Sequence, residues 1–246
     1  MQGMRLNRPP ALDPGRVALF LDLDGTIAEI ASRPGDVGPL PARTALLRRL
    51  GERLDGRIAI LTGRTLEDAD RILDGAVATA AAVHGLVRRD ASGGVAAVTP
   101  SPGLAAAREA LAQLAKARPG LVLEEKVASL ALHYRQAPEA EAGVLDASRR
   151  IAEAHGLALQ AGAMVSELRT PGPGKGDALI GILADKPFAG ASPVMVGDDL
   201  TDEAAFAAAA QMGGYGVLVG AERPTAARYR LDGVQAVMDW LLEAVG

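Results

Sequence analysis

Uninterrupted apolar runs alternate with helical patterns over the first third of the chain. The runs at 17–24, 57–62 and 78–83 are almost wholly apolar, which is typical of strands buried on both faces of a parallel sheet. Between them, leucines recur at helical spacing in 41–54, and 65–73 forms a second helical pattern that Thr65 can cap. This alternation predicts a doubly wound α/β sheet with right-handed crossovers.

The pattern changes after residue 90. Residues 90–94 favour a hairpin turn, and the Pro- and Gly-bearing stretches 99–103 and 170–174 bracket a segment of different character. Within that segment the chain reads as helix, two strands, helix, two strands. The predicted helices are 104–117 and 138–155, and the predicted strands are 121–126, 129–135, 158–160 and 164–168. Paired strands with two helices indicate a small α/β cap rather than a continuation of the parallel sheet.

The α/β alternation then resumes to the end of the chain. Its predicted elements are a helix from Lys175, a strand 193–197, a helix from Asp202, a strand 216–219 and a helix 233–245. We therefore expect an α/β protein whose mostly parallel core sheet is built from residues 1–102 and 169–246. The segment 103–168 is expected to form the inserted cap domain.

Composition narrows the possible functions. The 246 residues carry a net charge of -4 with both signs interspersed, and aromatic residues make up 3%, so neither a basic footprint nor stacking platforms for nucleic acid are expected. The chain has no cysteine, which excludes disulfides, thiolate metal sites and a cysteine nucleophile. The first apolar run is too short for a signal peptide or a membrane span. We expect a soluble cytoplasmic protein without a nucleic-acid or membrane partner.

Two carboxylates stand where the first predicted strand ends. If the strand pleat continues through Asp22 and Asp24, both side chains point to the same face. Paired carboxylates attract a hard cation such as Mg²⁺, and they can divide the roles of nucleophile and acid. The alternative is a strand that simply ends in an Asp-Gly turn.

Three later strand ends or helix starts carry further polar groups. Thr62 could hold a phosphoryl oxygen or merely lie in a turn. Lys175 opposes the macrodipole at a predicted helix start, so it is either a phosphate-binding group or a solvated lysine. Asp198, Asp199 and Asp202 exceed what one helix cap needs, although capping remains an alternative.

Taken in order, these motifs resemble those of the haloacid dehalogenase superfamily of phosphotransferases. The resemblance implies that Asp22 is the nucleophile and Asp24 the general acid and base, with Thr62 and Lys175 holding the phosphoryl group. It also implies a Mg²⁺ cofactor on the Asp22 carboxylate, the Asp24 main-chain carbonyl and Asp198. For Asp199 and Asp202 it leaves open whether they bind the metal or orient its ligands.

Further segments resemble the trehalose-6-phosphate phosphatase family. They are Phe20-Leu-Asp-Leu-Asp-Gly-Thr26, Leu61-Thr-Gly-Arg64, His84-Gly85, Leu123-Glu-Glu-Lys126, Ala131-Leu-His-Tyr-Arg135, Glu167-Leu-Arg169 and Gly197-Asp-Asp-Leu-Thr-Asp-Glu203. The resemblance implies that Arg64, Glu124, Lys126 and Glu167 bind substrate, the last three through hydroxyl groups of the distal glucose. From charge pattern alone, these three would be a solvated sheet face.

The family resemblance leads us to expect hydrolysis of trehalose 6-phosphate to trehalose and phosphate, as a step of trehalose biosynthesis. The partner is then a small sugar phosphate, and the oligomeric state stays open. Another capped sugar phosphatase, acting on sucrose phosphate or a mannosyl phosphoglycerate, is the nearest alternative. A mutase would require a bisphosphate activator, and a non-catalytic sensor would not need both Asp22 and Asp24.

Overall fold

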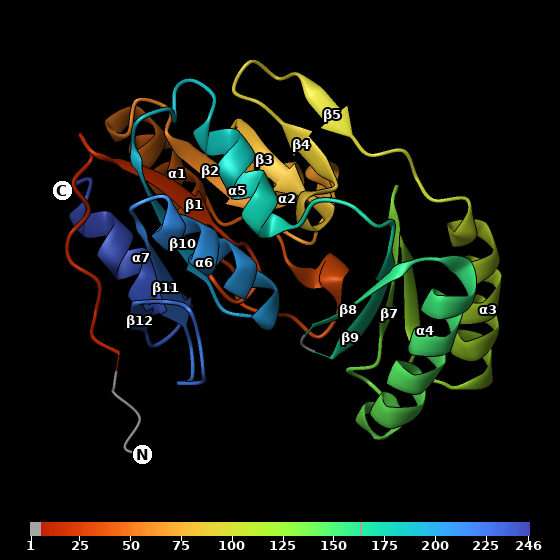
Figure 1. Ribbon diagram of the computed structural model, residues 1–246. Helices are drawn as coiled ribbons and strands as arrows, with labels where there is room; N and C mark the ends of the chain where they lie inside the picture. Colours follow the sequence, from red (N-terminus) through yellow and green to blue (C-terminus); the bar gives the residue numbers. More distant parts are fainter. Residues whose placement is uncertain (1–5, 163) are drawn as a thin grey trace. The chain divides into compact units, whose positions relative to one another are not determined.

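A computed structural model describes residues 6–162 and 164–246 and divides the chain into two units (Figure 1). The core unit comprises Met1–Ala96 and Pro173–Gly246, and the inserted unit comprises Ala97–Gly172. Residues 1–5, which the sequence assigned to the core, lie outside the described residues. Among the residues described, helices that combine the length and apolar character of a membrane span are absent.

The core unit is built on a mostly parallel sheet with the order β12-β11-β10-β1-β2-β3-β4-β5. All neighbours from β12 to β3 are parallel, and β4 runs antiparallel to β3. The strands are β1 Val17–Leu21, β2 Ile58–Leu61, β3 Thr79–Ala82, β4 Val87–Arg89, β5 Val95–Ala97, β10 Ser192–Gly197, β11 Tyr215–Val219 and β12 Tyr229–Leu231. The predicted doubly wound sheet is thus confirmed.

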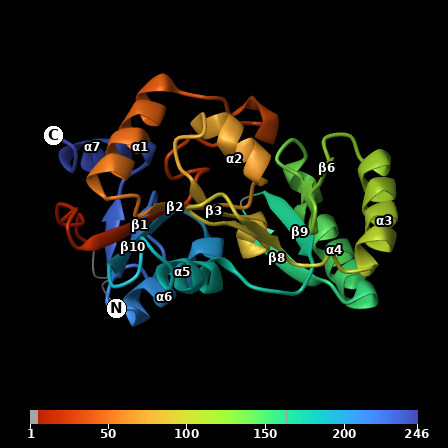
Figure 2. The same ribbon diagram turned by 90° about the horizontal axis from the view of Figure 1, so that it is seen from above.

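Helices cover both faces of the core sheet, as Figure 2 shows from above. On one face lie α1 Pro41–Arg53, α2 Leu66–Leu73 and α7 Val234–Glu243, packed on one apolar cluster. On the other face lie α5 Lys175–Leu183 and α6 Glu203–Gln211, packed on a second cluster. Because both faces are covered, the strands are apolar on both sides, as in the wholly buried run of β1.

The position of β1 between β2 and β10 creates a switch in strand order. The chain proceeds from β1 through β2 to β3 on one side, and later from β10 through β11 to β12 on the other. In open α/β sheets a crevice forms beyond the carboxyl ends of the strands at such a point. The residues that follow β1 and β10 are Asp22 and Asp198, so the sheet itself brings these two segments together.

The inserted unit is a four-stranded antiparallel sheet with two helices on one face. The strands, in the order β6-β7-β9-β8, are β6 Val122–Glu125, β7 Ser129–His133, β9 Val165–Arg169 and β8 Ala158–Gly162, and the helices are α3 Gly103–Ala117 and α4 Glu141–His155. Leu130, Leu132 and Leu168 pack toward the helices. Since side chains alternate along a strand, Ala131 and Glu167 point to the opposite face.

Several predicted elements are confirmed with small shifts of their ends, one strand ends early, and some elements were not expected. Thr65 caps α2, since its hydroxyl oxygen accepts a hydrogen bond from the N–H of Asp68 at 3.2 Å. The strand predicted at 17–24 ends at Leu21, and β12 was not expected. Short 3-10 turns were also not expected; they are Pro34–Asp36, Val83–Gly85, Pro138–Ala140 and Leu200–Asp202.

Candidate active site

Asp22 and Lys175 form a buried ion pair at the carboxyl end of β1. The ammonium group of Lys175 donates to Oδ1 of Asp22 at 2.7 Å and to Oδ1 of Asp202 at 2.7 Å. Asp22, Lys175 and Asp202 are 6%, 4% and 0% exposed, respectively. The N–H of Asp22 still donates to the carbonyl of Val196 on β10, at 2.9 Å, which fixes the backbone at the start of the site.

Lys175 stands at the start of α5, where the helix dipole disfavours a positive charge, and its ion pairs explain this position. α5 packs closely on α6, because a Cβ at Gly176 would lie 2.7 Å from the carbonyl oxygen of Ala204. This packing carries Lys175 to the two aspartates. Two ion pairs in a buried site outweigh the dipole effect, which is worth about 0.3–1 kcal/mol. A solvated lysine is therefore excluded by the structure.

The loop after β10 adds Asp198 to the cluster. Oδ2 of Asp202 accepts hydrogen bonds from the N–H groups of Asp198 and Asp199, each at 3.1 Å. Gly197 makes this close approach possible, since a Cβ there would lie 2.4 Å from the Asp202 carboxyl carbon. One ligand atom from each of Asp22, Asp198 and Asp202 falls within 4.8 Å of the others.

Crowding of these carboxylates shifts their pKa values. Burial raises the pKa of Asp22 well above its ordinary range, against the opposing effect of Lys175, and Asp202 and Asp198 raise it further. Burial, followed by the charges of Asp202 and Asp199, raises the pKa of Asp198 to about 7. The pKa of Lys175 is also raised, because its two carboxylate partners outweigh its burial. Lys175 is thus an ammonium group at neutral pH.

The donor set fits a hard divalent cation. Three carboxylates face one ammonium group, so the cluster retains negative charge, and oxygen is the ligand that Mg²⁺ prefers. The raised pKa values of Asp22 and Asp198 have the same cause, namely carboxylates held close together in a buried place. A cation between them would relieve that repulsion.

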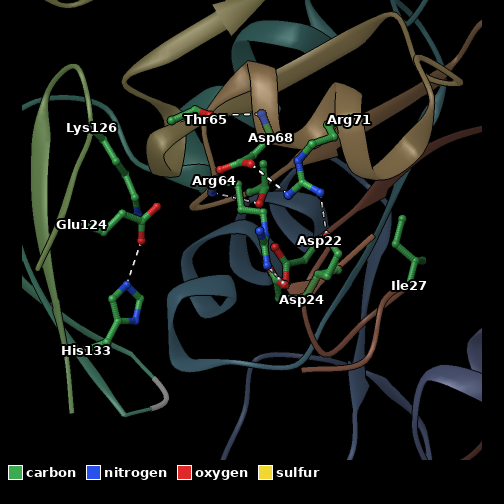
Figure 3. A network of polar contacts seen from close by, with 12 residues as sticks. Asp22, Asp24, Ile27, Arg64, Thr65, Asp68, Arg71, Glu124, Lys126 and His133 are labelled. Carbon is green, nitrogen blue, oxygen red and sulfur yellow. Dashed lines mark hydrogen bonds and ion pairs between the residues drawn. The ribbon is translucent and has the colours of Figure 1, made fainter. Parts of the chain in front are cut away.

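Asp24 lies in the turn after β1 rather than on the strand. Gly25 turns the chain with φ +78°, and the N–H groups of Ile27 and Ala28 donate to the carbonyl of Leu23. The expectation that a continuing pleat places Asp22 and Asp24 on one strand face is therefore wrong. The Asp24 carboxylate instead accepts two hydrogen bonds from Arg64, each at 2.7 Å (Figure 3).

Thr62 and Arg64 follow β2, and a hydrogen bond joins them. The hydroxyl oxygen of Thr62 accepts a hydrogen bond from the N–H of Arg64 at 3.1 Å, and Thr62 is 1% exposed. Its carbonyl accepts from the N–H of His84 at 2.9 Å. The hydroxyl hydrogen of Thr62 thus keeps the capacity to donate while its oxygen is held in place.

The predicted substrate-binding residues of the inserted unit share one face of its sheet. The register places Ala131 of β7 beside Glu124 of β6 on one side and beside Glu167 of β9 on the other. The Lys126 ammonium lies 3.4 Å from both Glu167 oxygens. His133 Nε2 lies 2.7 Å from Glu124 Oε2 (Figure 3). Because these charged groups pair with one another, they do not form a face of independent solvated charges.

The neighbours of Glu124 on this face keep its carboxylate charged. Burial raises the pKa of Glu124, but the hydrogen bond with His133 and the charge of Lys126 outweigh burial and hold that pKa below its ordinary value. The hydroxyl group of Ser129 donates to Glu167. Neither the bond from Ser129 nor the pairing of His133 with Glu124 was predicted from the sequence, although the segment Ala131–Arg135 that carries the family resemblance contains His133.

The chain has a buried Asp–Lys pair at the switch point of a doubly wound sheet, and a loop with further aspartates lies beside this pair. These features, together with the inserted unit, are those of the haloacid-dehalogenase-type phosphatase fold. The family model described as trehalose-phosphatase matches residues 20–235. The chain belongs to the trehalose-phosphatase family.

Individual relatives agree with this assignment. The chain is 38% identical over 240 residues to the trehalose-6-phosphate phosphatase of Escherichia coli (strain K12), covering 96% of this chain and 89% of that protein. The crystal structure of a trehalose-6-phosphate phosphatase related protein has 27% identity and a TM-score of 0.76, covering 91% of this chain and 95% of that one. The C-terminal domain of the C. albicans trehalose-6-phosphate phosphatase shares the fold, with 21% identity and a TM-score of 0.82, covering 96% and 97% of the two chains.

Proposed function

We propose that this protein is a magnesium-dependent phosphatase that hydrolyses trehalose 6-phosphate to trehalose and inorganic phosphate. The observation that carries the proposal is the cluster of buried Asp22, Lys175 and Asp202 with half-buried Asp198, in a chain of the trehalose-phosphatase family. The reaction would proceed in two steps through an aspartyl-phosphate on Asp22.

In the first step Asp22 attacks phosphorus. Lys175 donates to Oδ1 of Asp22 and so holds the carboxylate in place for the attack. A bond forms between a carboxylate oxygen of Asp22 and phosphorus while the bond from phosphorus to the sugar oxygen breaks. The positive charge of Lys175 lowers the repulsion between two anions, and Lys175 and the hydroxyl hydrogen of Thr62 would hold phosphoryl oxygens.

Asp24 would give a proton to the departing sugar oxygen. In the second step it would take a proton from the water that attacks phosphorus, which releases phosphate and restores Asp22. Both Asp24 oxygens accept hydrogen bonds from Arg64, which holds the carboxylate in a defined orientation. An incoming phosphate competes for the same guanidinium group, which gives Arg64 its role in binding substrate.

Mg²⁺ would be held by the carboxylates of Asp22 and Asp198 and by the main-chain carbonyl of Asp24. The ion would supply positive charge that stabilises the phosphoryl oxygens in the transition state. Both oxygens of Asp202 already accept hydrogen bonds, Oδ1 from Lys175 and Oδ2 from the N–H groups of Asp198 and Asp199. Asp202 therefore orients its neighbours in this proposal rather than binding the ion.

The inserted unit would act as the cap that selects the sugar. Glu124, Lys126 and Glu167 offer charged hydrogen-bonding groups on one face of its sheet, and their mutual pairing holds them in defined positions. Sugar hydroxyls both donate and accept, so carboxylates beside an ammonium group suit them. Ala131 between the two glutamates keeps the middle of the face free of a long side chain.

The test is phosphate release from a panel of sugar phosphates, with and without Mg²⁺. We expect turnover of trehalose 6-phosphate in the presence of Mg²⁺ and loss of turnover after chelation. Faster turnover of sucrose phosphate or a mannosyl phosphoglycerate would contradict the proposed substrate but not the chemistry. Binding of trehalose 6-phosphate without release of phosphate at saturating Mg²⁺ would contradict the proposal that the protein is an enzyme.

A further inference from the structure

Arg223, in the loop between β11 and β12, contacts the backbone of the loop that follows β10. Its Nη2 donates to the carbonyl oxygen of Asp199 at 2.9 Å and to that of Asp198 at 3.3 Å. Its Nη1 pairs with the carboxylate of Glu203 in the first turn of α6. One guanidinium group therefore joins the β10 loop to a helix of the core.

Glu203 fixes the segment from which Arg223 projects. Its Oε1 accepts a hydrogen bond from the hydroxyl of Thr225 at 2.8 Å, and its Oε2 accepts one from the N–H of Ala226 at 2.7 Å. These two bonds are independent of the contacts that Arg223 makes with the carbonyl groups. The guanidinium is thus presented to the β10 loop by a segment that is itself anchored.

The β10 loop is held from two sides as a result. The N–H groups of Asp198 and Asp199 donate to Asp202, and the carbonyl groups of the same two residues accept from Arg223. The orientation of these peptide groups decides where the Asp198 carboxylate points. That carboxylate lies in a cluster with Asp22 and Asp202, whose charges repel it, so the loop needs restraint to keep Asp198 in place.

We propose that Arg223 is a positioning residue for divalent-cation binding, because it holds the loop that carries Asp198. The inference rests on the proposed cation site. Residues that orient metal ligands without touching the metal typically contribute 10–100-fold to metal affinity. Arg suits this role because its planar fork donates in two directions at once, to Glu203 with one nitrogen and to the carbonyl oxygens with the other.

The experiment measures Mn²⁺ binding to the protein alone, by electron paramagnetic resonance of the free ion. We expect Arg223→Ala to weaken Mn²⁺ binding about tenfold. The Mg²⁺ concentration for half-maximal phosphate release should rise by the same factor, while kcat at saturating Mg²⁺ stays close to that of the wild type. Arg223→Lys keeps the charge but loses the fork, so its affinity should lie between the two.

The matched control is Arg228→Ala. Arg228 belongs to the same loop, is exposed, and lies over the ring of Tyr229 with 5.4 Å to its centroid. We expect its Mn²⁺ affinity to equal that of the wild type. Wild-type affinity in Arg223→Ala, or equal weakening in Arg228→Ala, would overturn the inference.

Two further outcomes are decisive. If Arg223→Ala fails to fold, Arg223→Lys decides, and wild-type Mn²⁺ affinity in that variant would overturn the inference. A wild-type protein that binds Mn²⁺ but releases no phosphate from trehalose 6-phosphate would contradict the proposed function alone, since weakened Mn²⁺ binding in Arg223→Ala would still support the role of Arg223.

Discussion

At the scale of single residues, Lys175 determines how its two aspartate partners can act. It pairs with Asp22 and Asp202 in a site where all three residues are buried. Removing one partner of a buried ion pair generally costs about 3–5 kcal/mol, because the remaining charge is left uncompensated. The double pairing moderates this cost for Asp22, since Lys175 keeps Asp202 when Asp22 is replaced.

We expect Asp22→Asn to abolish phosphate release while the protein stays folded. An amide is a far weaker nucleophile than a carboxylate, so turnover should fall by at least about three orders of magnitude. The measurement is phosphate release from trehalose 6-phosphate, with circular dichroism to check the fold. Asp239→Asn on the exposed side of α7 is the control and should keep wild-type activity. Substantial activity in Asp22→Asn would contradict the mechanism.

We expect Mg²⁺ to stabilise the protein more at pH 8 than at pH 5.5. The pKa of Asp198 is about 7 in the folded protein against an ordinary value of 3.8, so the folded state binds the extra proton between these values. The contribution of Asp198 to the stability of the cation-free protein should therefore fall as pH rises through this window and level off above about 7. Mg²⁺ must displace that proton, which makes its binding weaker at low pH.

The size of the Mg²⁺ effect can be estimated. At a concentration 100 times its Kd, the ion adds about 2.7 kcal/mol at pH 8, or about 5–10 °C in Tm, and a much smaller amount at pH 5.5. The measurement is thermal unfolding at both pH values with Mg²⁺ or with NaCl of the same ionic strength. Equal increases in Tm at the two pH values would argue against Asp198 as a ligand.

At the scale of elements, the turn after β1 places two catalytic candidates in different surroundings. β1 ends at Leu21, Asp22 still bonds to β10, and Gly25 then reverses the chain. Asp22 is left facing Lys175, while Asp24 faces Arg64. A strand that continued to Asp24 could not separate them in this way.

We expect Gly25→Ala to lower both Mg²⁺ affinity and activity. A Cβ at residue 25 would lie 2.1 Å from Oδ2 of Asp198, so either the turn or the carboxylate must move. The positive φ of +78° adds about 1–2 kcal/mol of strain for a residue with a side chain. Phosphate release as a function of Mg²⁺ concentration measures the effect.

Gly75→Ala separates strain from displacement of Asp198. Gly75 has a φ of +62° and open space where a Cβ would stand, so its replacement carries a similar strain without a clash. We expect a similar decrease in Tm but unchanged Mg²⁺ dependence. If both variants changed the Mg²⁺ dependence equally, the contact between Gly25 and Asp198 would not be the cause.

The elements were predictable where one local pattern decided them. Apolar runs identified β1, β2 and β10 because both faces of the sheet are covered, and Thr65 was recognisable as the cap of α2 from its position alone. The apolar pattern could not reveal the turn after Leu21. Leu23 is apolar and buried in this turn, as it would also be in a strand. The short edge strand β12 gave no such pattern.

At the scale of the whole molecule, two units divide the proposed chemistry from the proposed selection of substrate. The core unit holds the residues around Asp22, and the inserted unit holds Glu124, Lys126 and Glu167. The order of the motifs indicated correctly that Asp22, Lys175 and Asp198 are neighbours. Pairings such as Arg64 with Asp24 or Arg223 with Asp199 were not predictable, because they join long side chains across segments with no shared pattern.

We expect Lys126→Ala to lower activity on trehalose 6-phosphate more than activity on p-nitrophenyl phosphate. The small ester has no sugar for the inserted unit to bind, so only trehalose 6-phosphate would lose a charge-assisted contact, worth about 1.5–3 kcal/mol or roughly 10–150-fold in kcat/KM. Lys116→Ala, on α3 of the same unit, is the control. An equal loss on both substrates would contradict the role of Lys126 in selectivity.

The position of β1 in the middle of the core sheet has a consequence for synthesis of the chain. Its neighbour β2 emerges from the ribosome soon afterwards, but β10 begins at Ser192, after the whole inserted unit. Until then the wholly apolar β1 has an open edge, which is a hazard for aggregation of the nascent chain. Rapid folding of the inserted unit, whose contacts are local, would shorten the distance that β10 must search.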